Sequence, residues 1–172
     1  LYRFSRKIQT ISEFKNLLST YTMVFSDHPT VTNLLKHDID VGNAIPIKQS
    51  PYRVHPEKLK VIKAELEKLE NTGSVPKPDG TIRLCGDMRK VNSVTVSDSY
   101  PLPRIDDLID RVGQSIYLTK WDLTKGFWQV PLTDRAKEIC SVTTPFGLYK
   151  FNVMPFGLKN APATFQRLMN IV

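Results

Sequence analysis

The stretch WDLTKGFWQVPL, residues 121–132, begins inside a run of residues that favours a β-strand. This run, residues 116–123, is rich in β-branched and aromatic side chains, which is typical of strands. Asp122 stands near the carboxyl end of the expected strand, and Gly126 follows just beyond it. An isolated aspartate at such a place is more often a turn or capping residue than a catalytic one. The stretch nevertheless marks the place at which polar chemistry could lie.

A hairpin and a helix are expected after this stretch. Residues 139–144 and 148–153 are rich in strand-forming residues and flank Pro145-Phe146-Gly147, a turn-like sequence. Asn160 can cap the following helix, and Pro162 suits its first turn. The expected core face of this helix consists of Phe165, Leu168, Met169 and Val172. Strands and helices in this order predict an α+β fold.

Three stretches upstream have the periodicity of amphipathic helices. The first would begin at Ser12 and act as a packing element, with the apolar residues Phe14, Leu17, Leu18, Tyr21 and Phe25. The second would carry Pro56 in its first turn and end at Gly73, with the apolar stripe Leu59, Ile62, Leu66 and Leu69. The third would end near Gly113, with Ile105, Leu108, Ile109 and Val112 on one face. Prolines in residues 26–56 favour an extended segment between the first two.

A short hairpin signal, Asp79-Gly80, lies between the second and third helices. Little more than Ser74 and Val75 is available as the incoming arm, so residues 81–85 lack an obvious partner strand. Gly86 would weaken the outgoing strand further, because it has no side chain to pack. We therefore expect a hairpin that lacks most of one arm.

Composition narrows the class of protein but does not decide it. A hydrophobic content of 41% and a charged content of 24% are ordinary for a globular chain. The net charge of +7 favours a polyanionic partner, although a merely basic surface is the alternative. Cys85 and Cys140 have no metal-ligand spacing and are expected to be buried free thiols. Because no apolar run is long enough to span a bilayer and no signal peptide opens the chain, we expect an intracellular protein.

Three long blocks carry a family resemblance: RLCGDMRKVNSVTVSDSYPLPRIDDL at 83–108, WDLTKGFWQVPL at 121–132 and TPFGLYKFNVMPFGLKNAPATFQRLM at 144–169. Their order and spacing resemble the reverse transcriptases of Gypsy-type LTR retrotransposons, as do HDID and PIKQSPYR further upstream. The resemblance runs from about residue 37 to residue 172. It implies part of a right-hand polymerase fold, with fingers at about 37–103 and 130–158 and palm at about 104–129 and 159–172. Residues 1–36 would form an N-terminal helix and linker.

The resemblance implies a metal-dependent site around Asp122. This residue falls on the first catalytic aspartate of the family, and the backbone carbonyl of Leu123 falls on a second metal contact. Both would bind Mg²⁺, which accepts hard oxygen ligands and supports nucleotidyl transfer. Thr124, Lys125 and Gly126 would form the turn beneath the triphosphate.

Further residues would contact the incoming nucleotide. Phe127 falls where the family carries an aromatic ring against the sugar, which would exclude a ribose 2′-hydroxyl by shape; a core aromatic is the alternative. Lys77 and Arg83 look like the cations that grip the triphosphate, although ordinary solvated charges are also consistent. Phe156 and Gly157 would lie nearest the nucleotide. The partners implied are an RNA or DNA template-primer and deoxynucleoside triphosphates.

The chain departs from the family pattern in two places. The family carries a turn with two adjacent aspartates that would come after Val172, so we expect these residues alone to be inactive. The short join from Gly73 to Val75, together with Gly86 and Met88, indicates damaged fingers. Two alternatives therefore stay open: a nucleic-acid-binding remnant without chemistry and a poorly folded relic. A longer Pol polyprotein with RNase H is a further expectation.

Overall fold

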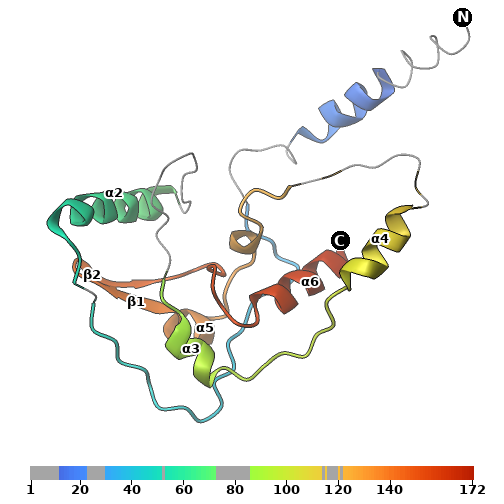
Figure 1. The fold of residues 1–172 in the computed structure, drawn as a ribbon. Coiled ribbons are helices and arrows are strands. Elements are labelled where there is room, and N and C mark those ends of the chain that lie inside the picture. Colours follow the sequence, from blue (N-terminus) through green and yellow to red (C-terminus); the bar gives the residue numbers. More distant parts are fainter. Residues whose placement is uncertain are drawn as a thin grey trace, which may run out of the picture.

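The computed structural model describes residues 12–22, 30–51, 53–72, 86–113, 115, 120 and 122–172. Residues 12–20 are helical. The elements that follow are α2 (Pro56–Thr72), α3 (Arg89–Val94), α4 (Ile105–Gly113), the 3-10 helix η2 (Gly126–Gln129), α5 (Asp134–Ile139), β1 (Ser141–Thr144), β2 (Gly147–Lys150) and α6 (Ala161–Ile171). Figure 1 shows α2 and the β1–β2 hairpin at one side of the molecule, α4 at the other, and the helix of residues 12–20 projecting away. This mixture of helices and strands confirms the α+β class.

The hairpin forms where the sequence predicts it, but its strands are shorter. β1 and β2 pair antiparallel, from Ser141 opposite Lys150 to Thr144 opposite Gly147. Thr144 closes the turn, since its hydroxyl donates to the Gly147 carbonyl at 3.0 Å and accepts from the Phe146 amide at 3.1 Å. The predicted strand 148–153 ends at Lys150. Beyond it the chain bends, and Val153 makes only an isolated bridge to Pro131.

Two short helices were not expected from the sequence. Ile139, predicted to open a strand, is instead the last residue of α5. The side chain of Thr133 caps α5 by accepting from the Ala136 amide at 3.2 Å. α3 begins after Met88 and has no side-chain cap. Both helices are only six residues long, which is too short for a clear helical period.

The predicted longer helices are present. α2 buries Leu66 of its predicted stripe, whereas the apolar faces of the other three are more exposed than expected. In residues 12–20 Phe14 and Leu17 are 52% and 55% exposed, so the described residues do not show the expected packing. Ile105 and Ile109 on α4 are likewise exposed. On α6 the expected core positions Met169 and Val172 are exposed, which corrects the prediction. The residues that α6 buries are Ala161, Ala163, Thr164 and Leu168. Small side chains in its first turns bring this end of the helix close to the core.

The core lies between segments that are far apart in sequence. Two isolated bridges hold it together, one between His37 and Leu132 and the other between Pro131 and Val153. Residues 129–132 thus lie between the 30–41 segment and the chain that leaves the hairpin. The buried core residues are Ile39, Met88, Val130, Leu132, Ala136, Cys140, Met154, Leu158, Ala161 and Leu168. Cys140 is a buried free thiol, as predicted, whereas Cys85 lies outside the described residues.

Gly86 and Met88 pack against this core. A Cβ at Gly86 would lie 2.7 Å from Met88 Cε and 3.0 Å from Val142 Cγ2. Met88 is buried, and its sulfur lies 3.9 Å from the Cys140 thiol. Gly86 lies outside any strand, and the strand that it was expected to weaken, residues 81–85, lies outside the described residues. Both residues pack against the core, and the expectation of damaged fingers stays a prediction. The predicted hairpin around Asp79-Gly80 lies outside the described residues.

Candidate functional site

The turn after Asp122 is the centre of the candidate site. Asp122 and Leu123 are exposed and lie outside any strand, as does Lys120, whereas residues 116–119 and 121 lie outside the described part of the chain. The turn at 124–125 leads directly into η2, whose Trp128 amide donates to the Lys125 carbonyl at 2.8 Å. The side chain of Gln129 also donates to the Thr124 carbonyl at 3.0 Å. These bonds fix the turn against the 3-10 helix.

Lys125 has a backbone conformation that lysine rarely adopts. Its φ and ψ are 52° and 44°, in the left-handed region, and it is the one non-glycine residue with positive φ in the described part of the chain. Its Nζ lies 5.7 Å from the centroid of the Trp128 ring. Partial burial lowers the pKa of Lys125. The turn therefore presents a cation folded back over an aromatic face.

Gly126 lets α6 approach the turn closely. A Cβ at this position would lie 2.9 Å from Cζ of Phe165 and 3.1 Å from its Cε2. Real Cβ contacts are essentially never shorter than 3.0 Å, so any side chain here would displace the ring. The glycine is therefore needed for packing against Phe165.

Phe127 brings two of the quoted sequence blocks together. Its half-buried ring lies 5.6 Å from Phe156 and 5.2 Å from Phe165, measured between centroids. Phe156 also lies 6.4 Å from Trp128 and remains 48% exposed. The 122–127 turn and Phe156, which were both predicted to lie beside the nucleotide, are thus neighbours in space. The alternative for Phe127, a core aromatic, is consistent with its packing but does not account for the exposed ring beside it.

Gly157 is held in place by a residue that sequence reasoning did not single out. Its φ is +93°, and a Cβ added to it would meet nothing within 4 Å. The Asn92 amide donates to the Gly157 carbonyl at 2.7 Å, and the Asn92 side-chain oxygen accepts from the Lys159 amide at 2.8 Å. Asn92 lies on α3, so its two bonds tie the 156–159 turn to this helix. In the sequence, Asn92 could have been singled out by its position within the 83–108 block.

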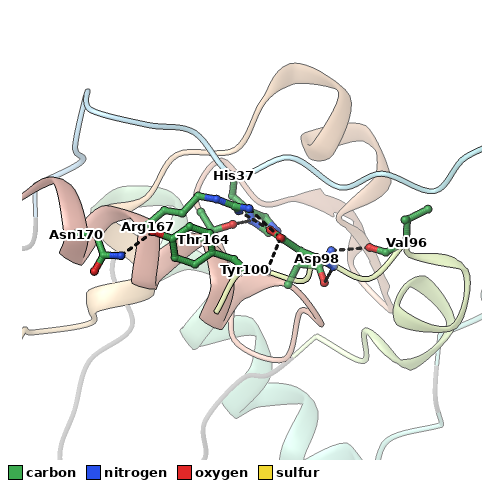
Figure 2. Close-up of polar contacts among 8 residues, drawn as sticks. His37, Val96, Asp98, Tyr100, Thr164, Arg167 and Asn170 are labelled. Carbon is green, nitrogen blue, oxygen red and sulfur yellow. Dashed lines mark hydrogen bonds and ion pairs between the residues drawn. The ribbon is translucent and has the colours of Figure 1, made fainter. Parts of the chain in front are cut away.

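A group of polar side chains supports α6 from behind (Figure 2). Asn160 does not cap the helix with its side chain, which corrects the prediction. Instead, its Nδ2 donates to the Val96 carbonyl at 2.7 Å and its Oδ1 accepts from the Asp98 amide at 3.1 Å. The side chain of Asn160 therefore bonds to residues 96–98 instead of to the backbone amides at the start of α6.

The same support continues along α6 through Arg167. Its Nη2 donates to Asp98 at 2.8 Å, and a second bond joins Nη1 to the same carboxylate. These bonds from Arg167 hold the pKa of Asp98 below its usual value. The guanidinium also lies 4.4 Å from the Tyr100 centroid, and Asn170 donates to the Tyr100 hydroxyl at 2.6 Å. Residues 96–100 are thus fixed along one side of α6.

His37 connects α6 to the N-terminal segment. Its Nδ1 lies 2.7 Å from the hydroxyl of Thr164, and both side chains are buried. Burial lowers the pKa of His37, although Asp38 and Asp98 oppose this effect. Asp38 in turn pairs with Arg135 at the start of α5. The helix behind the candidate site is therefore held by segments before and after α2.

The donor atoms at the turn suit a hard cation. The exposed Asp122 carboxylate and the Leu123 backbone carbonyl are oxygen ligands of the kind that Mg²⁺ prefers. Mg²⁺ is commonly bound through one or two carboxylates together with substrate phosphates, and these two groups fit such a partial shell. The described residues contain no group of three or more acidic, histidine or cysteine side chains that could hold a metal ion. Lys77 and Arg83 lie outside the described part of the chain.

No helix within the described ranges has both the length and the apolar character to span a bilayer.

Known proteins resemble this chain in both sequence and fold. The family model "Reverse transcriptase (RNA-dependent DNA polymerase)" matches residues 75–172, more than half of the chain. The Pol polyprotein from transposon 412 of Drosophila melanogaster is 34% identical over 93% of this chain, which spans 15% of that polyprotein. An RNA-directed DNA polymerase homolog of Oenothera berteroana is 48% identical over 54% of this chain, and the match covers 65% of that protein.

Foamy virus protease-reverse transcriptases are among the solved structures that match. One crystal structure of the prototype foamy virus protein has a TM-score of 0.78 at 23% identity, covering 94% of this chain and 24% of that chain. Another, in complex with an RNA/DNA hybrid, has a TM-score of 0.70 at 21% identity. These likenesses confirm the prediction of a partial right-hand polymerase fold.

Proposed function

The chain belongs to the reverse transcriptase family, and we propose that its 122–127 turn forms part of the active site of an RNA-directed DNA polymerase domain. We assign the domain to a Gypsy-type LTR retrotransposon, an assignment supported by the identity with the transposon 412 polyprotein. Its fingers would comprise about residues 37–103 and 130–158, and its palm about 104–129 and 159–172, after an N-terminal helix and linker in 1–36. RNase H would belong to a longer parent polyprotein. Because the substrates are nucleoside triphosphates and RNA, we place the protein inside the cell.

The metal-binding part of the proposal rests on two oxygen donors. Asp122 would hold Mg²⁺ through its carboxylate, and Leu123 would add its backbone carbonyl. When bound, the metal lowers the pKa of the attacking 3′-hydroxyl and neutralises charge on the triphosphate. Thr124, Lys125 and Gly126 would lie beneath the phosphates, while Lys77 and Arg83 would grip them from the fingers.

One observation carries the nucleotide site: the Phe127 ring lies 5.6 Å from Phe156, which joins the Asp122 turn to the Phe156-Gly157 turn. Packing against Phe165 on the other side limits how far the Phe127 ring can move. A ring held in this way can exclude a 2′-hydroxyl by shape, so that deoxynucleotides would be preferred. Phe156 and Gly157 would complete the surface beside the nucleotide.

This proposal can be tested by comparing the binding of dATP and ATP. NMR titrations of the chain with Mg²⁺ present should show tighter binding of dATP. Phe127→Ala, and the milder Phe127→Leu, should reduce this preference by up to about tenfold, because they remove part of the steric barrier. Phe146→Ala removes a partly exposed ring on the hairpin turn and serves as the matched control. Equal affinities in the unmodified chain, or an unchanged preference in both Phe127 variants, would contradict the proposal.

A second candidate is binding of nucleic acid without chemistry, which the net charge of +7 favours. The partner would be an RNA or DNA template-primer. If phosphate contacts lead the binding, the logarithm of the affinity for an RNA/DNA hybrid should fall linearly with the logarithm of the salt concentration. Primer extension separates the two candidates. We expect no incorporation by these 172 residues, since the described part contains no group of three or more acidic, histidine or cysteine side chains that could hold a metal ion.

A further inference from the structure

Gly157 gives the 156–159 turn a conformation that needs support from elsewhere in the chain. Its φ of +93° lies in the left-handed region that favours glycine, and a Cβ added there would meet nothing within 4 Å. Leu158, on one side of Gly157, is buried in the core, whereas Phe156, on the other side, is 48% exposed. Because glycine has no side chain to restrict its backbone, the orientation of Phe156 relative to Leu158 depends on what holds this turn.

Asn92 holds the backbone of the turn with both ends of its side-chain amide. Its Nδ2 donates to the Gly157 carbonyl at 2.7 Å, and its Oδ1 accepts from the Lys159 amide at 2.8 Å. A donor faces an acceptor in both bonds, so the pair fits this orientation of the amide and not the reversed one. Since the nitrogen and the oxygen are each already bonded to the turn, Asn92 acts on the turn rather than on a ligand.

α3 gives Asn92 a fixed base. Met88, which precedes the helix, is 4% exposed, and Thr95, which follows it, is 7% exposed. The Thr95 carbonyl also accepts a hydrogen bond from Nζ of Lys159 at 3.0 Å. The 156–159 turn is thus tied to α3 and its C-cap, and the residues at both ends of α3 are buried.

Phe156 connects this turn to the ring that we place against the sugar. Its centroid lies 5.6 Å from that of Phe127 and 6.4 Å from that of Trp128. Aromatic rings at such separations attract one another, and close packing means that a shift of one ring displaces its neighbour. A shift of the backbone at Gly157 should therefore displace Phe156 and leave the Phe127 ring with more room to move.

We propose that Asn92 is a positioning residue for sugar discrimination, because it fixes the Phe156-Gly157 turn and thereby limits the movement of the Phe127 ring. The inference rests on the proposed nucleotide site and deepens it, since it adds a residue of α3 to those that determine the preference for a deoxynucleotide. A purely structural Asn92 would stabilise the fold and leave this preference unchanged.

The test is the ratio of the affinities for dATP and ATP, measured by NMR titration of the 172-residue chain with Mg²⁺ present. Partial unfolding lowers both apparent affinities by the same factor, so the ratio reports on the site and not on stability. Asn92→Ala should reduce the ratio about threefold, a factor within the usual range for the loss of a hydrogen bond. Ser93→Ala is the matched control on the same helix, because the Ser93 hydroxyl bonds to the Lys90 carbonyl, and it should leave the ratio unchanged.

Asn92→Asp separates the hydrogen bonds from the size of the side chain. The carboxylate can still accept from the Lys159 amide, but it presents an oxygen to the Gly157 carbonyl and loses that bond. The ratio should therefore fall at least as far as in Asn92→Ala. A full ratio in Asn92→Asp would overturn the inference, because a side chain of the same shape would then suffice.

The Phe156→Leu background decides whether Asn92 acts through the ring. Adding Asn92→Ala there should cause no further fall in the ratio. An equal fall in both backgrounds, or an unchanged ratio in Asn92→Ala, would overturn the inference alone. Equal affinities for dATP and ATP in the unmodified chain would overturn the proposed nucleotide site as well.

Discussion

Gly126 lies where the turn after Asp122 meets α6. The ring of Phe165 occupies the space that a side chain at this position would need, with its Cζ 2.9 Å from an added Cβ. The same ring packs against Phe127, so the glycine, the phenylalanine of the helix and the proposed sugar-side ring form one contact. Because the three residues are closely packed, a substitution at any one of them should displace the other two.

Gly126→Ala should therefore destabilise the fold by roughly 1–3 kcal/mol, the usual range for an overpacked site. Urea unfolding followed by circular dichroism measures this change. Gly113→Ala is the matched control, because nothing lies within 4 Å of a Cβ added there. If both alanine variants unfold at the same urea concentration as the unmodified chain, the close approach of Phe165 does not constrain residue 126.

At the scale of elements, α6 is held by loops on one side and by η2 on the other. Asn160 and Arg167 hold residues 96–98, while Thr164 meets His37. Figure 2 shows these contacts along one side of the helix. The opposite contact, between Phe165 and the residues around η2, carries the candidate site. A substitution that breaks the loop contacts should therefore shift α6, and with it the Phe165 ring that packs against the candidate site.

Asn160→Ala should cost about 1–3 kcal/mol, since two hydrogen bonds are removed, one with the partly buried Asp98 amide and one with the exposed Val96 carbonyl. Amide hydrogen exchange should then increase at Asp98, whose N–H loses its acceptor. Asn152→Ala, at an exposed asparagine after the hairpin, is the control. A cap at residue 160 would instead predict faster exchange in the first turn of α6 with no change at Asp98, and that result would contradict the bridging role.

For the whole molecule, the buried contact between His37 and Thr164 joins residues that are 127 positions apart. Burial lowers the pKa of His37 in the folded state. As the pH falls below about 6.5, the unfolded chain therefore takes up this proton first. The contribution of His37 to the free energy of unfolding is therefore complete above about pH 6.5. It declines as the pH falls towards the folded-state pKa of His37.

The expected result is a free energy of unfolding that decreases as the pH falls below about 6.5, measured by urea unfolding at each pH. His37→Asn keeps a polar atom near Thr164 and removes the titrating ring, so the decrease should become smaller. His55→Asn changes an exposed histidine and serves as the matched control. A decrease of the same size in His37→Asn would show that other groups cause it.

Much of this architecture follows from local sequence. Four of the helices and the hairpin have a period, a proline or a turn residue that marks them, and the right-hand polymerase fold follows from the resemblance of three long blocks. These features depend on residues close together in the chain, where backbone geometry and side-chain period act directly. The short helices α3 and α5 have too few residues to show such a period.

The candidate site also has some features that follow from the sequence and others that only the tertiary structure decides. The sequence by itself determined the family and the candidate residues Asp122 to Phe127, Phe156 and Gly157, because they stand in contiguous motifs. Only the tertiary structure decided that Phe127 touches Phe156 and Phe165, that Asn160 bridges to residues 96–98 instead of capping α6, and that Lys125 rests on Trp128. Each of these depends on which distant groups compete for the same space or the same hydrogen bond, and that competition is settled only when the whole chain packs.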